Sequence, residues 1–162
     1  MTPRRHDRLT RTATESGNSL HHWRSAKPPW TVAKNYAAIV VARHSPSLRL
    51  KNWLFRRLGM RVDNGARWAL ESTPDVFFPE LITVERDAII GYDATILCHE
   101  FLQDEFRTGP VTIGAEAMVG AGAIVLPGVE IGTRASVAAN SLVTEDVPAE
   151  TTVAGVPAEP VE

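Results

Sequence analysis

The sequence predicts an all-β solenoid, a parallel β-helix of six-residue repeats that follows an N-terminal helical hairpin and a disordered basic arm. Three observations lead to this fold class: apolar residues recur at a spacing of six, small residues follow them at fixed offsets, and basic residues gather near the N-terminus. We expect the arm over residues 1–29, the helices over 30–60 and the β-helix over 61–162, with a loop at 101–110.

An aromatic or β-branched residue occupies every sixth position in two long stretches of the second half of the chain. The positions are Phe78, Val84, Ile90 and Ile96, then, after an interruption, Ile113, Val119, Val125, Ile131, Val137 and Val143. A spacing of six fits the two-residue period of a strand and not the 3.6-residue period of a helix. Each repeat is therefore expected to make one short strand and one turn, and three repeats to close a coil around branched side chains. Strands of a β-sandwich do not keep so fixed a spacing.

Small residues mark the corners of the predicted coils. A glycine follows the apolar residue at Gly91, Gly114, Gly120 and Gly132, where we expect it to adopt the dihedral angles that a corner needs. The repeats stop after Ile96 and resume at Ile113, so that residues 98–110 form an insertion. Loops inserted into a solenoid leave its stack undisturbed and often carry function.

The charge of the chain is divided unevenly. Residues 1–61 hold 13 of the 17 Lys and Arg and only two acids, a net charge of +11, whereas residues 62–162 carry −13. Residues 1–29 show no periodicity, which predicts a disordered or loosely docked arm. The basic N-terminal region is expected to attract the acidic body, or to make weak contact with an anionic membrane surface. No nucleic-acid recognition motif is present, so we expect no nucleic-acid partner.

Two helices are predicted between the arm and the repeats. In the first, over residues 30–43, apolar side chains recur at helical spacing and Thr31 is the expected N-cap. The second, over residues 47–58, is expected to bury one apolar face, made of Leu50, Trp53, Leu54 and Leu58. Gly59 suits its C-terminal end.

Cysteine content and hydropathy suggest a cytoplasmic location. Cys98 is the only cysteine, so an intrachain disulfide is impossible and a reducing compartment is expected. No apolar run approaches the length of a membrane span. Arg4 and Arg5 are not followed by the apolar core of a signal peptide.

The last repeats carry a specific resemblance. They read Ile131-Gly-Thr-Arg-Ala-Ser-Val-Ala-Ala-Asn-Ser-Leu-Val-Thr-Glu-Asp-Val-Pro148, followed by Val153-Ala-Gly-Val-Pro157. This stretch resembles the terminal coil of the hexapeptide-repeat acyltransferase superfamily, closest to its maltose and galactoside O-acetyltransferase branch. Pro46–Leu54 and Phe77–Leu81 resemble segments of short acetyltransferases that begin with two helices. The resemblance implies a left-handed helix, a homotrimer with active sites between subunits, and acetyl transfer from acetyl-CoA to a small-molecule acceptor, with a sugar hydroxyl as the first expectation.

His99 is the expected catalytic base, because it lies in the last repeat before the inserted loop, where the family places its catalytic histidine. An imidazole, whose ordinary pKa is near ~6.5, suits general-base chemistry at neutral pH. An acid should orient the ring, and Asp104, Glu105 and Glu80 are candidates between which the sequence does not choose. A nucleophilic Cys98 is conceivable, but a buried, inert cysteine is favoured.

The resemblance also implies positions for both substrates. Asp75 and Glu80 lie near the position of acceptor-binding residues in the sugar acetyltransferases, although Asp75 after Pro74 also suits a turn. Ala121, Ala139 and Thr144 match small residues that let the pantetheine arm of CoA approach the backbone.

One departure from the family concerns the phosphates of CoA. The family usually carries basic residues where this chain has Glu145 and Glu159. Two anions beside a polyanionic ligand call for compensation. Arg134, or cations of the N-terminal region, are expected to supply it.

Two other functions are weighed against acyl transfer. Trimeric carbonic anhydrases of this fold bind zinc through three histidines, whereas this β-helix holds one, so no metal is expected. A non-catalytic trimeric scaffold, or a module that binds a membrane surface, remains the alternative.

Overall fold

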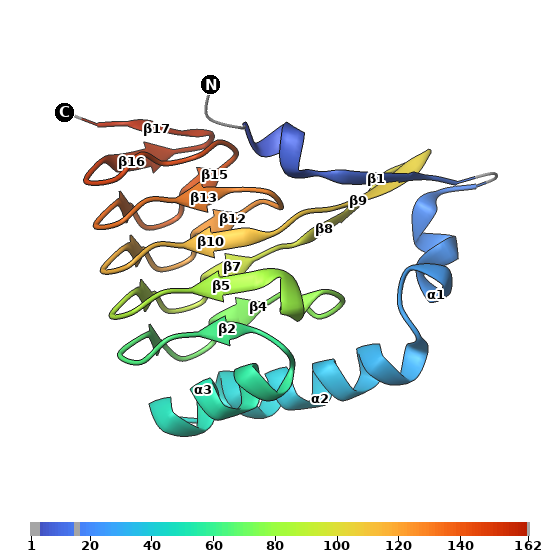
Figure 1. Cartoon of the computed structure of the whole chain (residues 1–162), viewed down its shortest axis with the longest axis horizontal. Helices are drawn as coiled ribbons and strands as arrows, with labels where there is room; N and C mark the ends of the chain where they lie inside the picture. The colour runs from blue at the N-terminus through green and yellow to red at the C-terminus, as the bar shows by residue number, and fades with distance from the viewer. Residues whose placement is uncertain (1–3, 15–16, 162) are drawn as a thin grey trace.

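The computed structural model describes residues 4–14 and 17–161 and contains a parallel β-helix over most of its second half (Figure 1). Consecutive strands belong to three different parallel sheets in turn, so the chain winds into stacked coils. The first sheet holds β2 (Arg61–Val62), β5 (Ile82–Val84), β10 (Val111–Ile113) and β13 (Glu130–Ile131). The second sheet holds β3 (Arg67–Trp68), β6 (Ile89–Ile90), β11 (Met118–Val119), β14 (Ser136–Val137) and β16 (Thr152–Gly155), with β17 (Ala158–Pro160) antiparallel at its edge. The third sheet holds β4 (Thr73–Pro74), β7 (Thr95–Ile96), β12 (Ile124–Val125) and β15 (Leu142–Val143).

The six-residue repeat predicts the core correctly from Val84 onward. Its apolar positions face inward and are at most 1% exposed from Val84 to Val143. The β-helix nevertheless begins one coil earlier, at β2, and Phe78 lies outside it, just before the short helix η3 (Pro79–Leu81). The first coil departs from the repeat because Pro74 occupies one of its positions, and because ten residues instead of six separate Pro74 from Val84.

The glycines that follow the repeat positions are needed for a reason other than the expected one. A Cβ built on Gly114 would lie 2.7 Å from the backbone nitrogen of Thr133 in the next coil, and one on Gly120 would lie 2.6 Å from that of Ala139. Positive φ angles occur instead at corner residues such as Asp93, Glu116 and Asn140. These glycines therefore permit close stacking of coils and do not supply corner dihedral angles.

Two helices, α2 (Pro29–His44) and α3 (Leu48–Arg57), cover the open end of the first coil (Figure 1). The predicted apolar face of α3 is correct in part: Leu58 is buried and Leu54 packs against the core, but Leu50 and Trp53 are exposed. Lys51, Asn52 and Phe55 are buried in the helix instead. α2 begins at Pro29 without Thr31 as its cap. The expectation for Gly59 is confirmed, since it follows α3 with a φ of +94°.

Polar side chains of α3 take the place of a missing coil. The carbonyl groups of Val84 and Ala88 in the second coil accept hydrogen bonds from backbone N–H groups of the first. Their counterparts one coil lower are Val62 and Ala66, which have no coil beneath them. Arg56 Nε donates to the Val62 oxygen (2.7 Å) and Asn52 Nδ2 to the Ala66 oxygen (2.9 Å). The helix thus supplies donors to carbonyl groups that lack a coil beneath them, and the Ala66 oxygen accepts a second hydrogen bond from Arg67 Nη1 at 3.1 Å.

The predicted loop and the predicted disordered arm form one antiparallel sheet. The insertion is a hairpin of β8 (His99–Phe101) and β9 (Glu105–Thr108), and β1 (Thr10–Ala13) of the arm pairs with the open edge of β9. The arm further contains η1 (Arg5–Arg8), η2 (Ser19–His22) and α1 (Trp23–Ala26). The described part of the arm is therefore ordered, because an unpaired strand edge offers backbone partners that sequence periodicity does not reveal. No helix in residues 4–14 and 17–161 combines the length and the apolar character that crossing a membrane requires.

Candidate active site

The site lies along one edge of the β-helix, which we call the His99 corner. This corner is where the chain leaves the third sheet after each of its four strands. The segments that follow these strands are Asp75, residues 97–99, residues 126–128 and residues 144–146. Because Pro74 pairs with Ile96 and Val125 pairs with Val143, these segments stack on one another in successive coils. Residues distant in the sequence therefore form one column.

His99 and Asp75 form a hydrogen-bonded pair in this column. His99 Nδ1 lies 2.6 Å from Asp75 Oδ2. The side chain of Asp75 is fully buried, and that of His99 is 17% exposed. The hairpin that begins at His99 and the coil below it thus bring an imidazole and a carboxylate into contact.

The carboxylate of Asp75 is held by several donors at once. Its Oδ1 accepts hydrogen bonds from the backbone nitrogens of Phe77 and Phe78, each at 2.8 Å, and its Oδ2 accepts one from that of Cys98 at 2.6 Å. An ionised carboxylate has acceptors only, so Nδ1 of His99 must carry the proton of the shared hydrogen bond. The other ring nitrogen, Nε2, is then left with a lone pair that can take a proton.

Aromatic rings enclose the imidazole. The ring centroid of His99 lies 4.8 Å from that of Phe77, 5.1 Å from that of Phe101 and 6.0 Å from that of Phe78. Trp23 of α1 packs edge-on against Phe77 at 6.0 Å. These walls fix the ring plane and lower the local dielectric, which strengthens the contact between His99 and Asp75.

Asp75 takes the position that the sequence left open for the acid beside His99. None of the three named candidates occupies it: Glu80 binds Lys27, Glu105 binds Arg107 at 2.6 Å, and Asp104 lies at the far end of the hairpin. The turn proposed for Asp75 is present, because its side chain bonds two and three residues ahead. Its contacts turn the carboxylate toward the protein interior, which does not favour the acceptor-binding role expected of it.

The cysteine next to His99 lies inside the core. Cys98 is completely buried. Burial, with a smaller contribution from the charge of Asp75, raises the pKa of its thiol far above the ordinary value. A thiol that stays protonated is a poor nucleophile, which leaves the imidazole as the reactive group of this pair of neighbours.

The residues expected to contact the acyl donor lie at two corners. Thr144 is at the His99 corner, two coils above His99. Ala121 and Ala139 stack on each other at the preceding corner, where the chain leaves the second sheet for the third; we call this edge the alanine corner. Arg134 lies at the remaining corner and pairs with Glu150. In the described residues no group of three or more His, Cys, Asp or Glu side chains is arranged to hold a metal ion.

Comparisons with known proteins agree with this fold. Residues 110–145 match the family described as "Bacterial transferase hexapeptide (six repeats)". The chain is 45% identical over 148 residues to the "Putative acetyltransferase YvoF" of Bacillus subtilis (strain 168), which covers 91% of this chain and 86% of that relative.

Two solved structures share the architecture at low sequence identity. The hexapeptide-repeat containing acetyltransferase VCA0836 of Vibrio cholerae O1 biovar eltor, complexed with acetyl coenzyme A, has a TM-score of 0.69 and 21% identity, covering 82% of this chain and 86% of that one. A maltose O-acetyltransferase of Clostridium difficile 630 has a TM-score of 0.60 and 17% identity, with the same two coverages. From the repeat, the coil and the relative that matches nearly its whole length, the chain belongs to the hexapeptide-repeat acetyltransferases.

Proposed function

We propose that this protein transfers an acetyl group from acetyl-CoA to a hydroxyl group of a small acceptor, a sugar or a similar molecule, with His99 as the general base. The observation that carries the proposal is the contact of His99 Nδ1 with the buried carboxylate of Asp75. That contact selects the tautomer whose Nε2 accepts a proton, and it stabilises the imidazolium that forms.

The reaction follows from this arrangement. His99 Nε2 removes the proton of the acceptor hydroxyl as its oxygen forms a bond to the thioester carbonyl carbon. The carbon–sulfur bond then breaks, and the departing thiolate takes the proton from the imidazolium of His99. The products are an acetyl ester and the free thiol of CoA, and His99 returns to its neutral form. Backbone N–H groups near the carbonyl would stabilise the intermediate oxyanion.

We further propose that the β-helix is left-handed and that the functional unit is a homotrimer in which the His99 corner of one copy faces the alanine corner of its neighbour. Within one chain, His99 and Ala139 lie at different edges of the β-helix, so one chain alone does not bring them together. A cyclic trimer repeats one heterologous contact three times and closes. The small side chains of Ala121 and Ala139 would then let the pantetheine arm run close to the backbone opposite His99.

Substitution of His99 tests the proposed base. We expect His99→Ala to lower the acceptor-dependent release of CoA from acetyl-CoA by ~10²-fold or more, because proton transfer in the transition state is lost. The release is measured with a thiol reagent against a panel of sugars, and binding of CoA by calorimetry should change little. His44→Ala is the matched control, since His44 is an exposed histidine near the end of α2.

Two outcomes would contradict the proposal. Acceptor-dependent turnover by His99→Ala at the wild-type rate would exclude His99 as the base. Absence of any CoA release by the wild-type protein, with every acceptor and with no measurable CoA binding, would instead favour the non-catalytic scaffold.

A further inference from the structure

The N-terminal arm lies across the His99 corner, between the catalytic hairpin and the last coil. Arg5 Nε donates a hydrogen bond to the carbonyl oxygen of Pro127 (2.6 Å), and Arg8 Nε donates one to that of Gly128 (2.7 Å). Pro127 and Gly128 belong to the coil between that of His99 and that of Thr144. The turn η1 is thereby fixed against the coil below that of Thr144.

The arm changes the charge of this corner. Four carboxylates belong to the hairpin and the last two coils here, those of Glu100, Glu130, Glu145 and Asp146. Arg5 pairs with Glu100 at 2.5 Å and is 8% exposed in its side chain. Arg8 pairs with Asp146 and lies 3.7 Å from Glu130. Without these two arginines, the corner would repel any anion that approached it.

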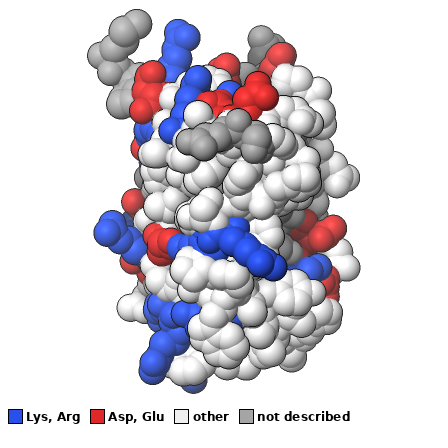
Figure 2. All heavy atoms as spheres, turned by 90° about the vertical axis from the view of Figure 1, so that its right-hand side faces the viewer, with Lys and Arg blue, Asp and Glu red and all other residues white. Residues whose placement is uncertain are grey.

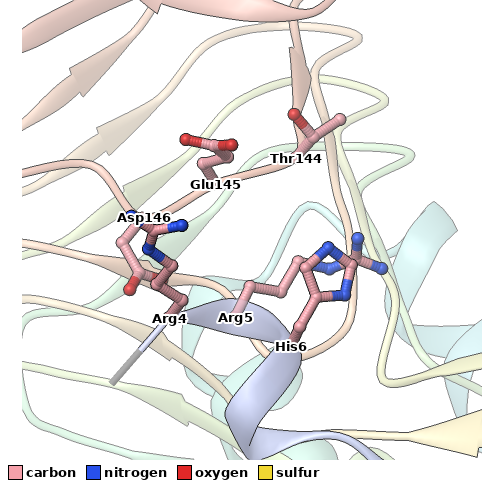
Figure 3. Close-up of a pocket in the computed structure, with 6 residues that line it drawn as sticks. All are labelled: Arg4, Arg5, His6, Thr144, Glu145 and Asp146. Carbon is pink, nitrogen blue, oxygen red and sulfur yellow. The ribbon is translucent and has the colours of Figure 1, made fainter. Parts of the chain in front are cut away.

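Two further arm residues face a cavity that Thr144 also lines. The cavity has a volume of about 380 Å³ and is bounded by Arg4, Arg5, His6, Thr144, Glu145 and Asp146. Figure 3 shows Arg4 and His6 reaching from the arm toward the segment that holds Thr144 and Glu145. Both are exposed, whereas Arg5 is buried. Figure 2 shows Lys and Arg side chains beside Asp and Glu at the end of the molecule where arm and last coil meet.

We propose that Arg4 and His6 bind the phosphates of the acyl donor, a nucleoside carrying a 3′-phosphate and a 5′-diphosphate, in this cavity. The inference rests on the proposed function, which places the thioester at His99 two coils below. Guanidinium and imidazole groups donate charge-assisted hydrogen bonds to phosphate oxygens. Arg5 and Arg8 serve this site indirectly, because they offset the fixed carboxylates.

The arm thus takes over the function that a basic residue in the last coil would have. Glu145 is exposed and can turn away from a bound phosphate. Asp7, the acid within η1, accepts a hydrogen bond from the backbone nitrogen of Arg4 at 3.0 Å and so stabilises the turn itself. Arg134, the other cation expected from the sequence, is held by Glu150 at a different corner.

Binding measurements with matched ligands test the inference. Calorimetry on the full chain is carried out with CoA, with 3′-dephospho-CoA and with S-acetylpantetheine, which has no phosphate. We expect the double variant Arg4→Gln/His6→Gln to bind CoA ~10-fold or more weakly, since charged hydrogen bonds are lost, and to bind S-acetylpantetheine as the wild type does. The dependence of CoA affinity on salt concentration should also become shallower.

The control is Arg11→Gln, an exposed arginine in β1 of the same arm, which should bind CoA as the wild type does. Glu145→Gln should strengthen CoA binding, which gives a second variant with the opposite expected sign. The inference is overturned if the double variant binds CoA within about twofold of the wild type, or if it loses the same factor for S-acetylpantetheine. The proposed function survives that result, because its own tests are CoA binding and turnover by the wild type and the loss of activity in His99→Ala.

Discussion

At the scale of single residues, Asp75 joins two coils of the β-helix as well as orienting His99. Its carboxylate accepts backbone hydrogen bonds from its own turn and from Cys98 in the coil above. The proposed base is therefore held by a group that is itself immobilised by the fold. Such support keeps an imidazole in one orientation while substrates enter and leave.

Substitution of Asp75 by asparagine should remove the correct tautomer while preserving shape. An amide nitrogen in place of Oδ2 would donate toward Nδ1 of His99 and could no longer accept from the Cys98 nitrogen. The imidazole proton would then move to Nε2, which abolishes the proposed base. We expect Asp75→Asn to lower kcat/KM by on the order of 10²–10⁴-fold. Nitrogen NMR of the imidazole should report the changed tautomer, a readout that a merely structural effect would not alter.

Glu80→Gln provides the comparison, because Glu80 is an acid near the same turn that pairs with Lys27 instead of His99. It should leave the tautomer of His99 unchanged, because Glu80 does not contact the imidazole. The same change of tautomer in both variants, or an unchanged tautomer in Asp75→Asn, would contradict the positioning role of Asp75.

The sequence predicted His99 as a site residue but did not predict Asp75 as its partner. The reason is that the repeat did not reveal how the first coil pairs with the second. Pro74 pairs with Ile96, so Asp75 lies one coil below Leu97, two residues before His99. That relation becomes visible only when β2, β3 and β4 are recognised as a coil. Pro74 at one of their repeat positions, and the broken spacing between Pro74 and Val84, hide the six-residue pattern.

At the scale of elements, α3 shows why helical periodicity predicted only part of the buried face. An apolar stripe normally marks the side that packs on a core. The end of a parallel coil, however, presents a row of backbone carbonyl groups as well as apolar side chains. Asn52 and Arg56 donate to those carbonyls, and Lys51 Nζ donates to the oxygen of Ala69 at 2.6 Å. Hydrogen-bond donors therefore occupy the face toward the coil, and Trp53 lies outside.

The buried Lys51 gives this cap a measurable pH dependence. Burial lowers the pKa of Lys51 from the ordinary 10.5, with a smaller opposing effect from Glu71. Between the folded and the unfolded pKa, the unfolded chain binds more protons, so this contribution to stability increases as pH rises toward 10.5. The increase is about 1.4 kcal/mol for each unit by which the pKa is lowered.

Denaturant titrations of Lys51→Met at several pH values test this effect. Compared with Lys51→Met, the wild type should gain unfolding free energy as pH increases up to about 10.5. Lys34→Met, at an exposed position of α2, should track the wild type at every pH. A constant difference between wild type and Lys51→Met would show that Lys51 keeps an ordinary pKa in the folded protein.

At the scale of the whole molecule, the order of the strands decides how the site can be assembled. The repeat alone predicted a solenoid, and the resemblance implied a trimer, but neither assigned residues to edges. The strand order places His99 and Thr144 at one corner and Ala121 and Ala139 at another. The arm and hairpin were also beyond the reach of the repeat, because they are held by pairing of β1 with β9 and by two arginines.

Mixing two inactive variants should therefore restore activity if each site is shared between neighbours. His99→Ala removes the proposed base, and Ala139→Trp places a bulky ring at the exposed alanine corner. In a cyclic trimer that contains both variants, one interface combines an intact His99 with an intact Ala139. Random mixing in equal amounts should then regain about one quarter of wild-type sites. Turnover is measured after joint refolding or coexpression.

Sites built within one chain predict a different result, because each variant would inactivate its own copies and mixing would restore nothing. The double variant His99→Ala/Ala139→Trp, mixed with wild type, separates complementation from simple dilution. In that mixture the intact interfaces again amount to about one quarter of the sites, whereas independent chains would retain about half. If Ala139→Trp prevents assembly, Ala121→Phe blocks the same corner one coil lower. Activity of about one quarter in both mixtures requires that one copy supplies His99 and its neighbour supplies the alanine corner. The separation of these residues on the β-helix leads to this expectation.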